Sequence, residues 1–220
     1  MSLVAIKRRA EAVKYEGERF ERLDLRSMKG FGSNFTSCLF EDCQFDLADL
    51  RTAKFTDCSF HRCSMRLANF AMATFEDSSF IACDLEQASF LGGYFRATLF
   101  SECRLCYGDT MFQDATVKGR LEFSDCNLHG SSLDFREVES GALKVMGCNL
   151  WSAKVSLGCA FWNGVFDDRS IRQFVALIAR VSQDAGLKEI AGEQYGVVCR
   201  AMDGRKGPVD VPIFHGMESA

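Results

Sequence analysis

The sequence has very little proline, which limits how its turns can be made. Only two of the 220 residues are proline, Pro208 and Pro212, and both lie within the last thirteen. All earlier turns must therefore be built another way. Long hydrophobic runs are also missing. No stretch reaches the roughly 18 apolar residues that a transmembrane helix needs, so we expect no membrane span.

An excess of charge of one sign is missing as well. The net charge is −4, too small to predict direct binding of nucleic acid or of an anionic membrane. The N-terminal stretch MSLVAIKRRAEAVKYEGERF has no apolar signal-peptide core. Cysteine, in contrast, is abundant, with eleven residues. An odd number of cysteines without a signal sequence favours reduced thiols and a cytoplasmic location over a disulfide scaffold.

What the sequence does have is a five-residue period, which first shows in CLFEDCQF at residues 38–45. Stepping by five from Phe20 to Leu105 meets a large apolar residue at every position except Gly30. The lattice resumes at Phe112 and Val117 and then at Phe123, Leu128, Leu133, Val138 and Leu143, and later at Leu150, Val155, Ala160 and Val165. Fourteen of the twenty phenylalanines lie on it. Neither a helix nor a flat strand explains this period.

A second lattice lies two residues before the first. From Ser33 to Cys103 every member is small, and eight of the eleven cysteines belong to it. Leu121 and Arg136 are exceptions. Cys38, Cys43, Cys58 and Cys63 therefore read as packing residues, since C-x4-C is not a zinc-finger spacing. Any reactive thiol is expected at Cys106, Cys159 or Cys199, which are off the lattice.

Five stretches carry the repeat most clearly: ADLRT (48–52), ANFAM (68–72), CDLEQ (83–87), ASFLG (88–92) and CNLHG (126–130). They resemble the pentapeptide-repeat family. The resemblance covers residues 20–165 and implies an all-β solenoid, a right-handed quadrilateral β-helix with one pentapeptide per side. At the inter-strand spacing of about 4.8 Å, this segment makes about seven coils and a rod of about 35 Å.

The chain then divides into four segments. Residues 1–19 are expected to cap one end, and residues 20–165 form the β-helix. Residues 166–202 form a small α-helical appendage, because Ile171, Phe174, Val175, Ile178 and Val181 follow helical spacing. This segment either caps the rod or mediates a homodimer. Residues 203–220 are expected to form a flexible tail.

Two outward surfaces are candidates for function. Leu47 and Leu67 fall at one corner, and Ala71, Met72 and Leu91 fall on the adjacent side, where solvent-facing residues are expected. This cluster is either a partner surface or a set of ordinary scattered apolar residues. The acidic pairs Glu41–Asp42 and Glu76–Asp77 form a candidate acidic surface.

Catalytic chemistry has no candidate residues. His61, His129 and His215 do not pair with one another, or with a cysteine, at ligand spacing. No phosphate loop or nucleophile motif occurs. We therefore predict a protein that is not an enzyme, with no catalytic residues, no cofactor and no metal.

We expect a protein–protein interaction scaffold with an unidentified protein partner. The resemblance implies an alternative, a DNA-mimicking protein that binds DNA gyrase or another type II topoisomerase and protects it from quinolones. Residues 20–165 hold 19 acidic and 14 basic residues, a net of −5. Duplex DNA would match this length with about twenty negative charges, so full-length charge mimicry is disfavoured. A secreted bacterial effector is a further alternative.

Overall fold

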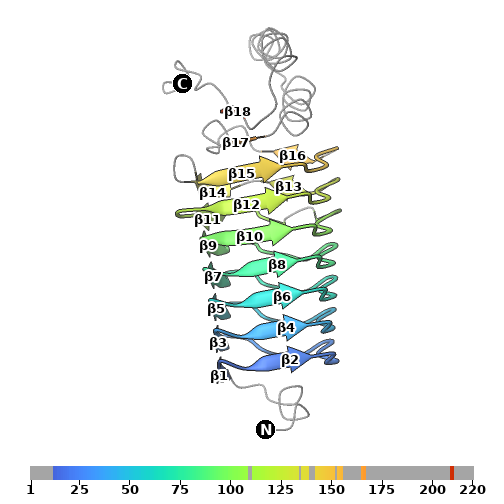
Figure 1. Cartoon of the computed structure of the whole chain (residues 1–220), viewed down its shortest axis with the longest axis vertical. Coiled ribbons are helices and arrows are strands. Elements are labelled where there is room, and N and C mark those ends of the chain that lie inside the picture. The colour runs from blue at the N-terminus through green and yellow to red at the C-terminus, as the bar shows by residue number, and fades with distance from the viewer. Residues whose placement is uncertain are drawn as a thin grey trace, which may run out of the picture.

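The computed structural model describes residues 12–108, 111–133, 135–138, 142–151, 153–155, 165–166 and 209–210. These residues form a stack of parallel β-coils, with the chain rising steadily along one axis (Figure 1). The all-β solenoid expected from the repeat is confirmed. The expected helices at 166–202 lie outside the described residues, except for the strand residue Phe166. Within the described ranges, no helix is long and apolar enough to cross a membrane.

The first wall of the tube is a seven-stranded sheet. Its strands are β1 (Lys14–Glu16), β3 (Asn34–Thr36), β5 (Lys54–Thr56), β7 (Thr74–Glu76), β9 (Tyr94–Arg96), β11 (Ala115–Val117) and β14 (Phe135–Val138). All neighbours are parallel, and Phe35 pairs with Phe55 twenty residues later. The first strand begins at Lys14, inside the segment expected to cap this end.

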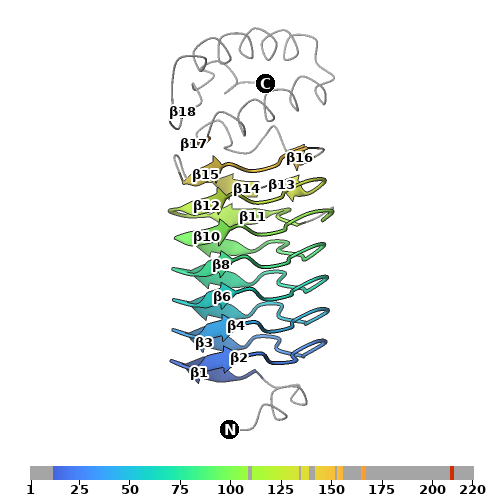
Figure 2. The same ribbon diagram turned by 45° about the vertical axis from the view of Figure 1, so that its right-hand side comes forward.

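The second wall is a nine-stranded sheet (Figure 2). Its strands are β2 (Arg19–Glu21), β4 (Leu39–Glu41), β6 (Ser59–His61), β8 (Ser79–Ile81), β10 (Thr98–Ser101), β12 (Leu121–Ser124), β15 (Leu143–Met146), β17 (Val165–Phe166) and β18 (Val209–Asp210). Only the last pair, β17 with β18, is antiparallel.

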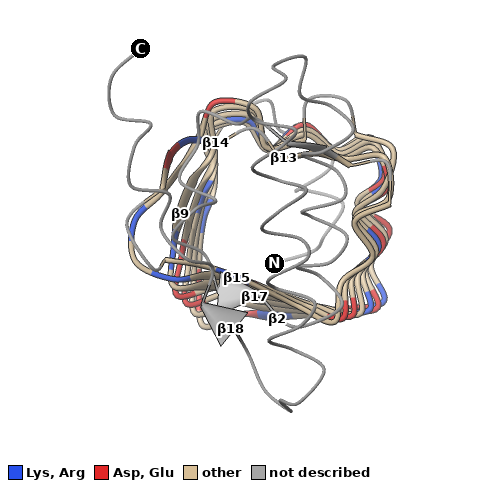
Figure 3. Cartoon of the chain, turned by 90° about the horizontal axis from the view of Figure 1, so that it is seen from above, with Lys and Arg blue, Asp and Glu red and all other residues tan. Residues whose placement is uncertain are grey.

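The third and fourth walls are held mainly by isolated bridges. The third wall runs upward from the bridge between Asp24 and Gln44, and the fourth from the bridge between Lys29 and Asp49. β13 (Ser132–Leu133) and β16 (Lys154–Val155) extend the fourth wall. Seen along its axis, the tube has a four-sided outline (Figure 3). Four pentapeptides therefore make one coil, as the resemblance implied.

Aromatic rings fill the tube. Phe40, Phe60 and Phe80 stack at centroid separations of 4.7–4.8 Å with nearly parallel planes. Phe40 also meets Phe45 of the next wall edge-on at 5.4 Å. Each fully buried phenylalanine contributes roughly 1.5–3 kcal/mol of transfer free energy, and favourable ring geometry adds to this. The repeat period thus places one large apolar group on the inner face of each wall.

The corners explain how the turns are made without proline. From Gly17 to Gly130, the residue two places after each central one has positive φ, as at Ser37, Asp42, Leu47 and Thr52. This turns the chain by a right angle and points the amide upward, so that Asp42 N donates to His61 O at 2.9 Å. Left-handed backbone is costly for residues other than glycine, by roughly 1–2 kcal/mol. Inter-coil hydrogen bonds and the filled core offset this cost.

Gly30, the exception in the central lattice, is explained by its neighbour. Met28 stands at the position that is otherwise small, and it is 2% exposed. A Cβ on Gly30 would lie 2.7 Å from Leu50 Cδ2 and 2.9 Å from Met28 Cε. The methionine therefore occupies the volume that a central side chain would need. Large and small residues have exchanged places at this one side.

Two residues of the predicted central lattice are wrong. Phe123 pairs with Val145, and Leu121 pairs with Leu143, so Val145 is the central residue of β15 and Leu143 lies two places before it. Likewise Phe166, not Val165, pairs with Val145. Residues two apart on a strand point to the same face. Leu121 and Leu143 therefore stay buried in the interior although they are large.

Candidate functional site

The predicted apolar cluster is largely exposed to solvent. The exposed fractions are 59% for Leu47, 51% for Leu67, 67% for Met72 and 37% for Leu91. Ala71 is half-buried. Leu47 and Leu67 stack at the corner between the third and fourth walls, while Ala71 and Leu91 stack on the fourth wall itself. Large apolar side chains that gather at one place on a surface are typical of interaction sites.

Around this cluster lies a surface without charge. Residues 67–75 (LANFAMATF) and 87–95 (QASFLGGYF) contain no acidic or basic residue, and they stack directly on one another. We call these two segments the uncharged belt. The coil below it carries Asp49, Arg51 and Lys54, and the coil above it carries Asp114. The belt covers the fourth wall and wraps onto the first wall at Tyr94.

The corners of the belt have the same left-handed backbone as the other corners, but they carry large apolar side chains. Leu67 and Met72 have φ values of 57° and 59°, and Leu47 below has 60°. Aspartate, which tolerates this region better, takes the equivalent place at Asp42 and Asp57. The fold does not require exposed apolar residues at these corners. The exposed apolar side chains, and not the backbone conformation, set these corners apart from the others.

Sequence reasoning missed Phe31 as a surface residue. It is 55% exposed and lies on the fourth wall two coils below Ala71. The Arg51 guanidinium lies over its ring, 5.7 Å from the centroid. The signal was present, because Phe31 directly follows the central position held by Gly30. It was hidden because that coil exchanges its large and small residues.

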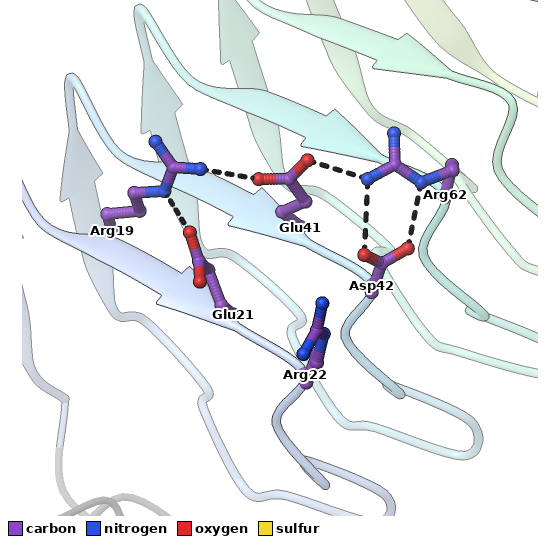
Figure 4. A pocket seen from close by; sticks show the side chains of 6 residues that line it. All are labelled: Arg19, Glu21, Arg22, Glu41, Asp42 and Arg62. Atoms are coloured by element: carbon purple, nitrogen blue, oxygen red, sulfur yellow. Dashed lines mark hydrogen bonds and ion pairs between the residues drawn. The ribbon is translucent and has the colours of Figure 1, made fainter.

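The first predicted acidic pair lies in a cleft of about 210 Å³ lined by Arg19, Glu21, Arg22, Glu41, Asp42 and Arg62 (Figure 4). Arg62 Nη2 lies 2.6 Å from Glu41 Oε1, and Arg62 Nε lies 2.8 Å from Asp42 Oδ1. Arg19 Nη2 also binds Glu41 Oε2 at 2.8 Å. These hydrogen bonds, with Arg62 as the main cause, lower the pKa of both Glu41 and Asp42.

The second predicted acidic pair is neutralised in the same way. Lys54 Nζ lies 2.8 Å from Glu76 Oε2, and this hydrogen bond is the main cause of a lowered pKa at Glu76. Arg96 Nη2 lies 2.8 Å from Asp77 Oδ2. The structure does not bring the two acidic pairs together, because Glu41 ends a strand of the second wall and Glu76 a strand of the first. Acidic and basic residues are interspersed around the whole outline (Figure 3).

The lattice cysteines are buried, and none of them forms a disulfide. Six of them form one vertical column: Cys43, Cys63, Cys83, Cys103, Cys126 and Cys148. Each thiol from Cys43 to Cys126 donates to a carbonyl of the coil below, as Cys83 Sγ does to Phe60 O at 3.4 Å. Packing and hydrogen bonding account for these residues. Of the off-lattice cysteines, Cys106 is also buried, and Cys159 and Cys199 lie outside the described residues.

The histidines lie apart. His61 is on β6, and His129 meets Tyr107 edge-on at 5.2 Å, while His215 lies outside the described residues. In the part of the chain that the structure describes, no three His, Cys, Asp or Glu residues are grouped so that they could hold a metal ion.

Comparison with known proteins gave one family match. Residues 33–109 match the model described as "Pentapeptide repeat region". A search of curated proteins found no match.

Several solved structures are similar to the chain. A trypsin-treated QnrB1, a plasmid-mediated fluoroquinolone resistance protein, is 16% identical, with 67% of this chain and 92% of that chain covered and a TM-score of 0.36. HetL, involved in heterocyst differentiation regulation in the cyanobacterium Nostoc sp. strain PCC 7120, is 13% identical, with 71% and 92% covered and a TM-score of 0.35. Rfr23 from the cyanobacterium Cyanothece 51142 is 14% identical, with 75% and 97% covered and a TM-score of 0.20.

Proposed function

We propose, from the premise that this chain is a pentapeptide repeat protein matched as such over residues 33–109, that it is a non-enzymatic scaffold that binds another protein through the uncharged belt. The observation that supports this most is the exposure of Leu67 and Met72 at left-handed corners. Both side chains cost backbone energy and bury little area within the chain. Binding a partner would bury them and recover transfer free energy of roughly 1.5–3 kcal/mol per side chain.

The belt also suits a protein surface better than a strongly charged ligand. Its two segments offer only backbone, hydroxyl, amide and apolar groups to a ligand. Central interface regions are typically depleted in charge, with charged groups at the rim. Arg51 below and Asp114 above provide such a rim. The cytoplasm remains our proposed compartment, because none of the nine described cysteines forms a disulfide.

The alternative role, binding of a type II topoisomerase by DNA mimicry, needs uncompensated negative charge along the rod. The carboxylates of Glu41, Asp42, Glu76 and Asp77 are each held by a basic side chain. This pairing favours the scaffold role over mimicry. A gyrase supercoiling assay with and without quinolone separates the two. Inhibition or protection at micromolar concentrations of this protein would favour the alternative.

The double substitution of Leu67 and Leu91 by glutamate tests the scaffold role. Charges placed on the belt should reduce capture of the partner protein at least about tenfold, because the interface would bury them. The matched control is Ile81→Glu, an apolar-to-acidic change on the outer face of the second wall. If the Leu67/Leu91 variant folds normally and captures partners as well as the wild type, the belt is not the binding surface.

A further inference from the structure

We propose that the uncharged belt binds the belt of a second copy of this chain, with the two rods side by side and antiparallel. This inference rests on the proposed function, because it names the partner of that same surface. The first step is the symmetry of the belt. It consists of two stacked segments, so a two-fold axis that runs across the face between them exchanges one segment with the other. Each vertical column of outward residues then faces the same column of the second copy, which runs in the opposite direction.

This operation brings large side chains against small ones. On the corner between the fourth and first walls, Met72 stacks below Gly92, with the Met72 amide donating to Leu91 O at 2.7 Å. The two-fold axis therefore places Met72 of one copy opposite Gly92 of the other. On the fourth wall, Leu91 stacks above Ala71 and is placed opposite the second copy's Ala71. Both columns are self-complementary, and each contact occurs twice.

The coils directly below and above the belt also complement each other in this arrangement. Thr52 below Met72 and Asp114 above Gly92 belong to the same column, because Thr52 N donates to Ala71 O and Gly92 N donates to Gln113 O. The axis brings Asp114 of one copy to the coil that carries Arg51 in the other. Asp114 is exposed, and its carboxylate forms no ion pair within the described ranges. Arg51 binds Asp49 at 2.8 Å within its own chain and can share its guanidinium.

The corner between the third and fourth walls supplies further apolar contact. Tyr107 is 51% exposed and stacks two coils above Leu67, with Gln87 between them. The same axis places Tyr107 opposite Leu47. The belt alone spans only about 10 Å of the rod's length. A patch this short buries less area than the roughly 1,200–2,000 Å² of a standard interface. With these flanking contacts we expect a reversible dimer with a dissociation constant in the micromolar range, about 1–100 µM.

Sedimentation equilibrium of the full chain between about 1 and 300 µM measures this association. The wild type should convert from monomer to dimer with rising concentration. Met72→Glu should raise the dimer dissociation constant at least about tenfold, because each interface would bury two unpaired carboxylates. Ile81→Glu should leave it unchanged. Circular dichroism checks that both variants are folded.

A charge exchange tests the antiparallel arrangement. Arg51→Glu and Asp114→Arg should each weaken the dimer about three- to tenfold. The double variant should return to within about twofold of the wild type, because the two new charges meet across the interface. Within one chain these residues lie three coils apart, so rescue requires a second copy. Arginine is accepted at such a corner, since Arg22 and Arg62 have the same backbone conformation.

Three results would overturn the inference. A chain that stays monomeric at every concentration would do so. In that case loss of partner capture by the Leu67/Leu91 variant would still support the proposed scaffold role. A dimer insensitive to Met72→Glu would place the contact elsewhere, for example in the C-terminal segment. A dimer weakened by Met72→Glu but not rescued by the charge exchange would contradict the antiparallel arrangement.

Discussion

At the scale of a single residue, Leu67 places an exposed leucine side chain on left-handed backbone. Its φ of 57° suits glycine, asparagine or aspartate better than leucine. The backbone amide of Leu67 donates to Glu86 O at 3.0 Å, a bond that any residue can make. The leucine side chain therefore adds little to the coil itself. We propose that its place at an exposed corner reflects a contact with a partner.

Replacing Leu67 by asparagine should separate stability from binding. We expect the free energy of unfolding to stay unchanged or to rise by up to about 1 kcal/mol, because the left-handed strain is reduced. Partner capture should fall at the same time. Urea denaturation and a binding assay on the same preparation measure both quantities. A clear loss of stability would mean that the leucine supports the corner after all.

The buried thiols belong to the same scale. Burial is the main cause that raises the pKa of Cys58 from 9.0 to about 12. A raised pKa in the folded state means that the thiol favours folding below about pH 9 and loses this contribution as the pH rises toward 12. The urea concentration at the unfolding midpoint should therefore decrease as the pH is raised from about 9 to about 12.

A conservative variant isolates this effect. Cys58→Ser should remain folded, because Ser78, directly above, already donates to Phe55 O at 3.3 Å from the same column. Its midpoint should fall less steeply with pH than that of the wild type. The folded wild type should also react slowly with a thiol reagent at pH 8 at its lattice cysteines. Rapid modification of Cys58 under native conditions would show that this part of the tube opens.

At the scale of one coil, the unit of packing is the pair formed by a central residue and the residue two before it. In most sides the central residue is large and its partner small, as in Ala68 and Phe70. Met28 and Gly30 invert the pair while filling a similar volume. The volume of the pair, rather than the identity of either member, is what the stacked coils require.

Substitutions at this pair should be strongly coupled. Gly30→Leu alone should cost about 1–3 kcal/mol through overpacking, since its Cβ would stand 2.7 Å from Leu50 Cδ2. Met28→Ala alone should cost about 2–4 kcal/mol through a cavity. The double variant should lie within about 1 kcal/mol of the wild type. A double-mutant cycle in urea measures the coupling, and simple additivity of the two single effects would refute this view of the pair.

The five-residue period sets how much of the structure the sequence could predict. The five-residue period was enough for the coils, the buried lattice and the exposed cluster from Leu47 to Leu91. It misplaced the centre at Leu143, because Leu143 and Val145 both face inward and periodicity alone cannot tell which one is central. It overlooked Phe31, which follows an inverted pair. Ion pairs such as that between Arg62 and Glu41 join residues on successive coils, and a linear reading sees only an acidic pair.

At the scale of the whole molecule, the rod combines a nearly uniform interior with an uneven exterior. Most of the length is ringed by paired charges, and surface ion pairs of this kind contribute only about 0–1 kcal/mol each. On two adjacent coils, the segments 67–75 and 87–95 carry no charge and expose Leu67, Met72 and Leu91. The interior sets the shape, and we propose that a partner binds where the charge pattern is interrupted.

Photo-crosslinking tests this account most directly. A photoreactive phenylalanine analogue at Leu67, and at Ile81 as the control on the second wall, is activated in cells that express the full chain, and the products are identified by mass spectrometry. The account predicts a protein adduct from position 67, containing a second copy of this chain, and none from position 81. Equal adducts from both positions, or none from position 67, would contradict it.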